Sequence, residues 1–369
     1  MSELTTVSDY ALKRSKRAEF FKRYGIVFLF LSPYLLFFAL FCLYPLFYGI
    51  VMSLMRYSIG NPAKNEWRGF QNFFTVLFDS DSYYHRQYWY AMGNTVKAAL
   101  ILVPLGIIVP LIFALLVNTK PKGYKVFRAI IYLPSIFPVA ASGVMFTALF
   151  GANFGYINQW IGSNIDWLGG STSTAWFIII LLCMWGGWGG NFMILSAGLK
   201  NIDKSLYEAA GVDGCTGIKR TFAVTLPAIK YQLILCLFTT IIGYFGLYGQ
   251  VYVLTGGGPR VYIDGRPYQS TMTIMWYLQN LINGKNGLDA FGMVSAMGLT
   301  LGVIIGAIAG IQLFVTRERK SGTKLAKEFF AHKKAKEEAV NIAENADRAA
   351  ETAIADADAI EPHDDGGGL

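Results

Sequence analysis

The residues best suited to chemistry in this sequence lie in the polar segment 206–227, LYEAAGVDGCTGIKRTFAVTLP, and that chemistry is recognition of a partner. Glu208 suits the positive end of a helix dipole, and Ala209 with Ala210 keeps a helix slim enough to lodge in a groove. Gly214 permits a left-handed turn. Because long apolar stretches flank the segment, the pattern predicts two short helices around a turn, presented outside the lipid as a handle for a cytosolic partner.

The boundaries of this helix pair follow from its capping residues. Asp203 or Ser205 can cap the first helix, because their side-chain oxygens accept a hydrogen bond from a free backbone amide. Residues 217–224 come after the turn and are expected to form the second short helix. Pro227 is expected to start the next apolar helix, since proline is tolerated in a first helical turn.

Constellations of catalytic residues are not found along the sequence. The histidines His85, His332 and His363 are scattered, and the four cysteines have no partner at metal-ligand spacing. The one Gly-Lys pair lacks the rest of a phosphate-binding loop, and the Gly-Gly-Gly-Pro run at 256–259 predicts a turn because its Lys-Ser/Thr ending is missing. The sequence therefore predicts no metal site, no cofactor in this chain and no enzymatic activity.

Long stretches without charge determine the predicted fold class. The chain is 54% hydrophobic and 15% charged, whereas soluble domains carry about a quarter charged residues. A membrane span needs about 20 apolar residues, and each of the charge-free stretches reaches that length. None of them contains an acid that could relay ions, so any energy input is expected to come from outside the chain. We predict an all-α polytopic membrane protein with six transmembrane helices, within 24–55, 98–117, 129–159, 171–199, 231–259 and 291–316.

The positions of the basic residues predict the orientation and the domains. The net charge is +8, and the Lys and Arg residues crowd before residue 24, at 120–128, at 200–230 and after residue 316, in alternate loops. This is the positive-inside pattern, so both termini are expected in the cytosol and nucleic-acid binding is not. The expected domains are a basic N-terminal tail, 1–23, a six-helix transmembrane domain, 24–316, with a cytosolic loop at about 200–229, and a cytosolic tail, 317–369, that is partly helical and then disordered.

A stripe of glycines marks one face of the last apolar stretch. Gly298, Gly302, Gly306 and Gly310 recur at four-residue intervals, which allows another helix to approach closely. Two interpretations stay open: an interface with another subunit, or packing within the same bundle.

The segment 206–227 resembles the Glu-Ala-Ala loop in permease subunits of bacterial ABC importers. In that family Glu-Ala-Ala is followed by three residues, Gly, nine residues, Ile, one residue and Leu-Pro; this chain departs only in having Val224 for Ile. The flanking runs GLKNIDKSLYEAAGVDG and VYVLTGGGP resemble the carbohydrate-uptake branch. The likeness covers about 24–316 and implies the type I ABC importer permease fold, multi-pass in the bacterial inner (plasma) membrane.

The resemblance also implies partners. A second, different permease would complete the path, two cytosolic ATPases that bind ATP and Mg would dock at the loop, and an extracytoplasmic binding protein would deliver a sugar, expected to be an oligosaccharide. The implied ATPase-coupling residues are Glu208, Ala209, Ala210, Asp213, Gly214, Leu226 and Pro227.

Substrate contacts are expected on the fourth and fifth stretches, by analogy with the family. Sugars are held by aromatic stacking and by hydrogen bonds in otherwise apolar pockets. The candidates are Trp185, Trp188, Asn191, Tyr244, Tyr248 and Gln250; the second and third of these are three residues apart, and the two tyrosines four, which would place each pair on one helix face. The alternative for each is packing between helices.

Other functions remain open at this point. A permease for amino acids or peptides would need a fixed charge in its path, and none is seen. A membrane-bound enzyme would need clustered His, Asp or Glu residues. A scaffold that holds cytosolic partners without transport would use the same loop, 206–227.

Overall fold

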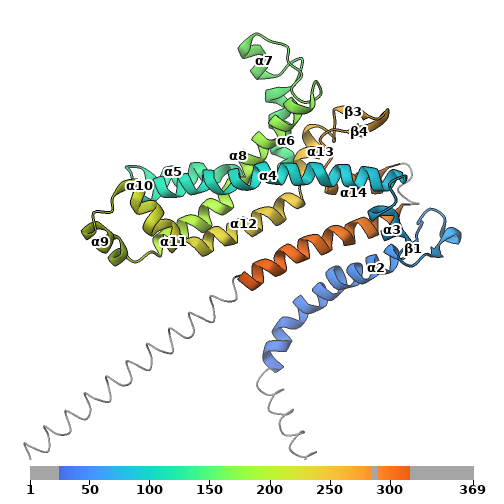
Figure 1. Ribbon diagram of the computed structural model, residues 1–369, viewed down its shortest axis with the longest axis horizontal. Helices are drawn as coiled ribbons and strands as arrows, with labels where there is room; N and C mark the ends of the chain where they lie inside the picture. Colours follow the sequence, from blue (N-terminus) through green and yellow to red (C-terminus); the bar gives the residue numbers. More distant parts are fainter. Residues whose placement is uncertain (1–24, 285–289, 316–369) are drawn as a thin grey trace, which may run out of the picture. The chain divides into compact units, whose positions relative to one another are not determined.

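The computed structural model describes residues 25–284 and 290–315, and these residues are mainly helical (Figure 1). Both predicted tails, including the helical part expected of the second, lie outside the described residues. The chain divides into two units, Met1–Ile308 and Ala309–Leu369; the described part of the second is the helical end 309–315.

Within the described residues, four continuous helices are long and apolar enough to cross a membrane. They are Gly25–Ser53, α4 (Tyr83–Asn118), α8 (Thr172–Lys200) and Phe291–Val315. The first contains a π-helical turn, η1 (Ala39–Leu43), followed by α2 (Tyr44–Ser53). Pro45 explains the turn, because its ring has no amide hydrogen and collides with the carbonyl one turn earlier.

The third predicted span is bent rather than continuous. It is formed by α5 (Tyr124–Tyr132) and η3 (Leu133–Ile136), and then by α6 (Val139–Phe150), with an angle of 96° between the two parts. Pro138 stands between them and forces Phe137 into an extended conformation. Residues 151–155 end α6, and a separate short helix, α7 (Tyr156–Ile161), follows, so the predicted stretch 129–159 does not form one continuous helix.

The fifth predicted span is also broken, at both ends. The segments α10 (Gly217–Arg220), η4 (Thr221–Thr225) and α11 (Leu226–Ala228) meet α12 (Lys230–Phe245) at 71°. Pro227 lies in the first turn of α11, but Ile229 then leaves helical geometry, so α12 does not start at the proline as predicted. After α12 the chain breaks at residues 246–248 before α13 (Gly249–Leu254). If each bent pair crosses once, the total is the predicted six spans.

The second span begins earlier than its charge-free stretch. α4 starts at Tyr83, after Ser82 accepts a hydrogen bond from the amide of Tyr84 at 3.2 Å. Because Lys97 interrupts the apolar run, the charge-free stretch placed the start of this helix too late in the chain. The preceding outer loop contains an antiparallel pair, β1 (Met55–Arg56) and β2 (Glu66–Trp67), a 3-10 turn, η2 (Pro62–Lys64), and the short helix α3 (Gln71–Leu77).

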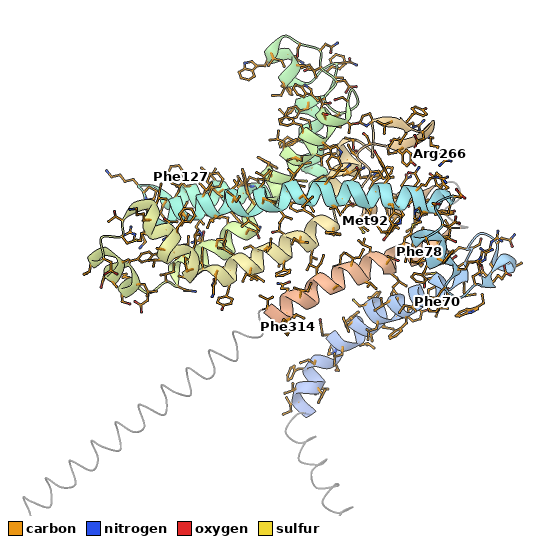
Figure 2. The ribbon with its side chains drawn as sticks, viewed as in Figure 1. Phe70, Phe78, Met92, Phe127, Arg266 and Phe314 are labelled. Atoms are coloured by element: carbon orange, nitrogen blue, oxygen red, sulfur yellow. The ribbon has the colours of Figure 1, made fainter. Side chains whose placement is uncertain are left out.

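The segment after α13 contains regular secondary structure beyond the turn predicted at 256–259. Gly256 and Gly257 take left-handed conformations, as the predicted turn requires. An antiparallel hairpin follows, β3 (Arg260–Ile263) with β4 (Arg266–Gln269), and then α14 (Ile274–Asn283). Figure 2 shows Arg266 on this hairpin.

The hydrophobic core lies along α4 and α8. Its largest fully buried side chains include Tyr88 and Leu102 from α4, and Ile178 and Ile179 from α8. A second cluster lies toward the basic end of the same helices and joins Phe192 to residues of α12. By contrast, the apolar window of Gly25–Ser53 is unburied within this chain, as expected of a helix that faces lipid or another subunit.

Candidate functional sites: a cytosolic hairpin and a central cavity

The helix pair predicted in the polar segment is present, and we call residues 203–225 the coupling hairpin. Its first helix is α9 (Lys204–Val212), capped by Asp203, whose Oδ1 accepts a hydrogen bond from the amide of Ser205 at 3.0 Å. This hydrogen bond to the carboxylate lowers the pKa of Asp203, because it favours the charged form. The prediction of Asp203 as a cap is confirmed.

Gly214 ends α9 in a Schellman motif. Its φ is +69°, the left-handed conformation that the sequence predicted. The amide of Cys215 donates to the carbonyl of Ala210 at 2.8 Å, and the amide of Gly214 donates to that of Gly211 at 3.1 Å. These bonds satisfy carbonyls at the helix end and direct the chain back toward α10, so the shape of the hairpin depends on this glycine.

The two arms of the coupling hairpin touch through Tyr207. Its hydroxyl lies 3.3 Å from the hydroxyl of Thr225, and the guanidinium of Arg220 lies 5.5 Å from its ring centre. Ala210 is buried on the same inner side. Both alanines were expected to face a partner. Ala209 is exposed, whereas Ala210 is buried within the chain.

The outer surface of the coupling hairpin mixes charge with exposed apolar side chains. Glu208 and Asp213 are exposed. Val212 is 90% exposed, Ile218 78% and Phe222 67%. Large apolar side chains concentrated on a short polar segment mark an interaction surface. Pro227 is exposed beyond the hairpin, and Leu226 is half-buried.

A central cavity of 480 Å³ lies between α8, α12 and the start of α13. Its polar lining comes from Asn191, Thr239, Thr240, Tyr244 and Gln250, and no acidic or basic residue lines it. The volume falls within the range of about 300–1,000 Å³ that small-molecule sites show. Hydroxyl and amide groups in an uncharged cavity suit a neutral, hydrogen-bonding ligand.

Asn191 also holds the walls of the central cavity together. Its amide nitrogen donates to the carbonyl of Gly106 at 2.7 Å and to the hydroxyl of Thr240 at 2.8 Å. The side chain thereby links α4, α8 and α12. Both amide hydrogens are used in these bonds, so the side-chain oxygen is the group of Asn191 that can accept from a ligand.

Three of the six predicted substrate residues line the cavity, namely Asn191, Tyr244 and Gln250. The other three pack against aromatic neighbours: Trp185 lies 6.0 Å from Phe137 and 5.9 Å from Phe146, Trp188 lies 5.4 Å from Phe113, and Tyr248 stacks on Tyr252 at 5.4 Å between ring centres. The expected shared face of the two tyrosines is wrong, because α12 ends at Phe245, before the second of them.

Sequence reasoning missed the threonines and glycines of the cavity. Thr239 and Thr240 supply hydroxyls, and glycines at 187, 190, 243 and 246 leave its space unfilled. The run Trp185–Asn191, WGGWGGN, carried a usable signal. Paired glycines inside a membrane helix remove side chains from two faces at once, and a following asparagine adds a polar group there.

The glycine stripe of the last span is free of contacts with the described part of the chain. A Cβ added at Gly298, Gly302, Gly306 or Gly310 would meet no atom within 4 Å. At Gly292, by contrast, it would collide with the carbonyl oxygen of Met55. Close helix packing within this chain therefore uses the start of the span and not the stripe.

Clusters that could bind a metal are not found in the ranges 25–284 and 290–315, where no three His, Cys, Asp or Glu side chains gather. All four cysteines are free, with Cys183 and Cys236 buried among apolar side chains.

Apolar helices that can cross a membrane, an uncharged cavity between them, and a helical hairpin at their basic end define a membrane transport protein. The chain matches the family model of binding-protein-dependent transport system inner membrane components over residues 102–320 and belongs to this family. It is therefore a multi-pass permease of the bacterial inner membrane, as the sequence predicted, and its family is one of transporters and not of enzymes.

Similar proteins come from several sugar transport systems. The chain is 28% identical over 331 residues to the arabinooligosaccharides transport system permease protein AraP of Halalkalibacterium halodurans, covering 87% of this chain and 97% of AraP. It is 29% identical over 310 residues to the lactose transport system permease protein LacF of Rhizobium radiobacter, covering 81% and 97%.

A solved structure confirms the fold. One chain of a bacterial alginate ABC transporter, in complex with an alginate pentasaccharide-bound periplasmic protein, matches with a TM-score of 0.66 at 22% identity, over 81% of this chain and 96% of that one. The predicted type I ABC importer permease fold is confirmed by this match.

Proposed function

We propose that this chain is a permease subunit of an ABC importer for a sugar, most simply an oligosaccharide, delivered by an extracytoplasmic binding protein. The observation that carries the sugar assignment is the central cavity, lined by hydroxyls, amides and Tyr244 without a charged side chain. An amino acid or peptide would bring charged ends that need fixed partners. The names of AraP and LacF support the same substrate class.

The coupling hairpin is proposed as the site where a cytosolic ATPase docks. Exposed Glu208, Ala209 and Asp213 lie beside the apolar side chains of Val212, Ile218 and Phe222. A helix of this kind suits a groove in a partner, where apolar anchors contribute most of the affinity and charges set the orientation. The ATPases would bind ATP and Mg, and two of them would serve two permeases.

A second permease is proposed as the partner of the first and last spans. The stripe from Gly298 to Gly310 meets nothing in the described chain, and Gly25–Ser53 is unburied. A different permease, giving a hetero-pair, would cover these surfaces. We further propose that 24–316 forms the membrane domain, with 1–23 and 317–369 as cytosolic tails.

Uptake of labelled sugar tests the transport function. The chain, co-expressed with its partner subunits, is reconstituted in vesicles with ATP inside and a binding protein outside, and labelled arabinose-type and lactose-type sugars are offered beside labelled amino acids. We expect ATP-dependent uptake of a sugar, reduced at least about tenfold by Thr240→Val, which leaves cavity groups unpaired. A matched Thr119→Val change outside the cavity should leave uptake intact. Uptake of amino acids alone would refute the sugar assignment.

A further inference from the structure

A second hollow, which we call the basic cavity, lies where the ends of α4, α5 and α8 meet. It has a volume of 230 Å³ and shares no lining residue with the central cavity. Its polar lining consists of Asn118, Lys120, Tyr124, Arg128, Ser196 and Lys200. The shared lining shows that the basic ends of the second and fourth spans lie on one side of the membrane, the cytosolic side by their charge.

Three cations face the basic cavity without a counter-charge. Lys120 follows α4, Arg128 belongs to α5 and Lys200 ends α8, and no acidic residue lines the hollow. Within the described ranges none of the three pairs with a carboxylate; the printed side-chain partner of Arg128 is the weakly accepting sulfur of Met193 at 3.5 Å. The negative ends of the α4 and α8 dipoles favour Lys120 and Lys200, whereas Arg128 is not at a helix C-terminus. The remaining positive charge calls for an anionic ligand.

A buried hydroxyl points to the same ligand. Ser196 lines the basic cavity, is 6% exposed, and its Oγ has no hydrogen-bond partner in the structure. It lies four residues before Lys200 and therefore on the same face of α8. A buried hydroxyl left unpaired costs free energy, and it can donate to an anionic oxygen that enters the cavity.

Exposed apolar side chains on two of the helices that line the basic cavity indicate where that anion comes from. Leu116, Phe127 and Ile130 are all exposed on α4 and α5, and Figure 2 shows Phe127 on the outside of α5. In a membrane these side chains meet acyl chains. Anionic phospholipids are enriched in the cytosolic leaflet, and basic hollows between spans bind their headgroups.

We propose that the basic cavity binds the phosphate group of an anionic phospholipid of the cytosolic leaflet. Lys120, Arg128 and Lys200 pair with the phosphate oxygens, and Ser196 donates a hydrogen bond to one of them. The acyl chains lie over the exposed apolar side chains of α4 and α5. Because Lys200 is followed directly by the coupling hairpin, a bound lipid joins α4, α5 and α8 at the root of that hairpin.

Native mass spectrometry of the whole complex tests this proposal. The full chain, purified with its partner subunits, is exchanged into detergent with either phosphatidylglycerol or phosphatidylcholine, and retained lipid is counted. We expect preferential retention of phosphatidylglycerol, weakened about fivefold by Arg128→Gln or Lys200→Gln and about threefold by Ser196→Ala. Lys125→Gln, on the same helix but outside the cavity, is the matched control and should retain lipid as the unchanged protein does.

Three results would overturn the proposal. Equal losses with Arg128→Gln and Lys125→Gln would mean that general surface charge attracts the lipid. Equal retention of the two lipids would remove the role of the anionic headgroup. Displacement of phosphatidylglycerol by millimolar inorganic phosphate would make a free anion the ligand. Arg128→Lys keeps the positive charge. If this variant retains lipid, the loss seen with Arg128→Gln comes from the missing charge and not from misfolding.

Discussion

The two ends of the helical bundle differ in how their connecting segments are held. At the outer end, buried side chains bind the loop backbone: Asn94 donates to the carbonyls of Ser270 and Met272, both at 3.1 Å, and Asn72 donates to those of Ser53 and Met55, both at 2.8 Å. At the opposite, basic end, the coupling hairpin leaves most of its apolar side chains exposed.

The outer end is therefore stabilised by contacts within this chain, whereas the coupling hairpin presents a surface for a partner. Side-chain amides placed under a loop satisfy buried carbonyls and hold it in one conformation. The coupling hairpin relies on a cap, a Schellman motif and one contact between its arms. Its geometry is well specified, but its surface is that of one half of an interface. Four substitutions or conditions test the comparison, in order of expected effect.

Removing a buried amide at the outer end should have the largest effect. Asn94→Leu removes the side-chain donor from the carbonyl of Met272, at a cost of about 1–3 kcal/mol, while the carbonyl of Ser270 keeps the indole of Trp176 at 3.3 Å. We expect a clear loss of thermal stability of the purified permease, while ATPase stays bound to the molecules that remain folded. Asn283→Leu, at an exposed position of α14, is the control. Unchanged stability with Asn94→Leu would show that the outer end is not held in this way.

Distorting the coupling hairpin should leave the bundle intact and release the ATPase. Gly214→Val places a β-branched side chain at a φ of +69°, at a cost of about 1–2 kcal/mol in the turn. Gly211→Ala in α9 is the opposite change, because alanine favours a helix and its Cβ meets nothing. We expect ATPase co-purification to fall with the valine variant and persist with the alanine variant. Equal retention by both would refute docking through the hairpin.

Reversing one exposed charge should have a smaller effect. Glu208→Lys changes the surface of α9 without touching its cap or its end. An exposed ion pair contributes about 0.2–1 kcal/mol, so we expect ATPase affinity to fall by up to about fivefold at low salt and the difference to shrink as salt is raised. Lys204→Glu near the start of the helix is a matched reversal. A salt-independent loss would contradict an electrostatic role for Glu208.

Acid should loosen the start of α9 by the smallest amount. The pKa of Asp203 is lowered by the amide of Ser205, so its contribution to helix stability is present above the unfolded pKa and is lost as the pH falls through the folded value, below 3.8. Hydrogen exchange of α9 amides at pH 6 and pH 3 measures this loss. Asp203→Asn keeps a capping oxygen and should remove the pH dependence; persistence of the dependence would assign it to another group.

Local signals in the sequence were sufficient for the coupling hairpin, because Asp203 and Gly214 act through neighbouring residues. The third and fifth spans were misjudged, since the absence of charge marks apolar residues but not the continuity of a helix across Pro138 or residues 246–248. Of the six residues predicted to contact substrate, three line the central cavity. The prediction relied too much on aromatic residues, because Trp185 packs between helices whereas Thr240 lines the central cavity.

The contact at Gly292 has a mechanical consequence. The backbone of the last span meets the end of the first span there, beside the carbonyl of Met55, so the two helices are fastened at their outer ends. Farther along, Gly298 and Gly302 meet no described atom. The two helices are close at one end and have open space farther along, so a helix that packs between them would set the angle between the two. A bulkier residue at 292 would change the angle between the two helices, and the resulting displacement would grow with distance from this contact.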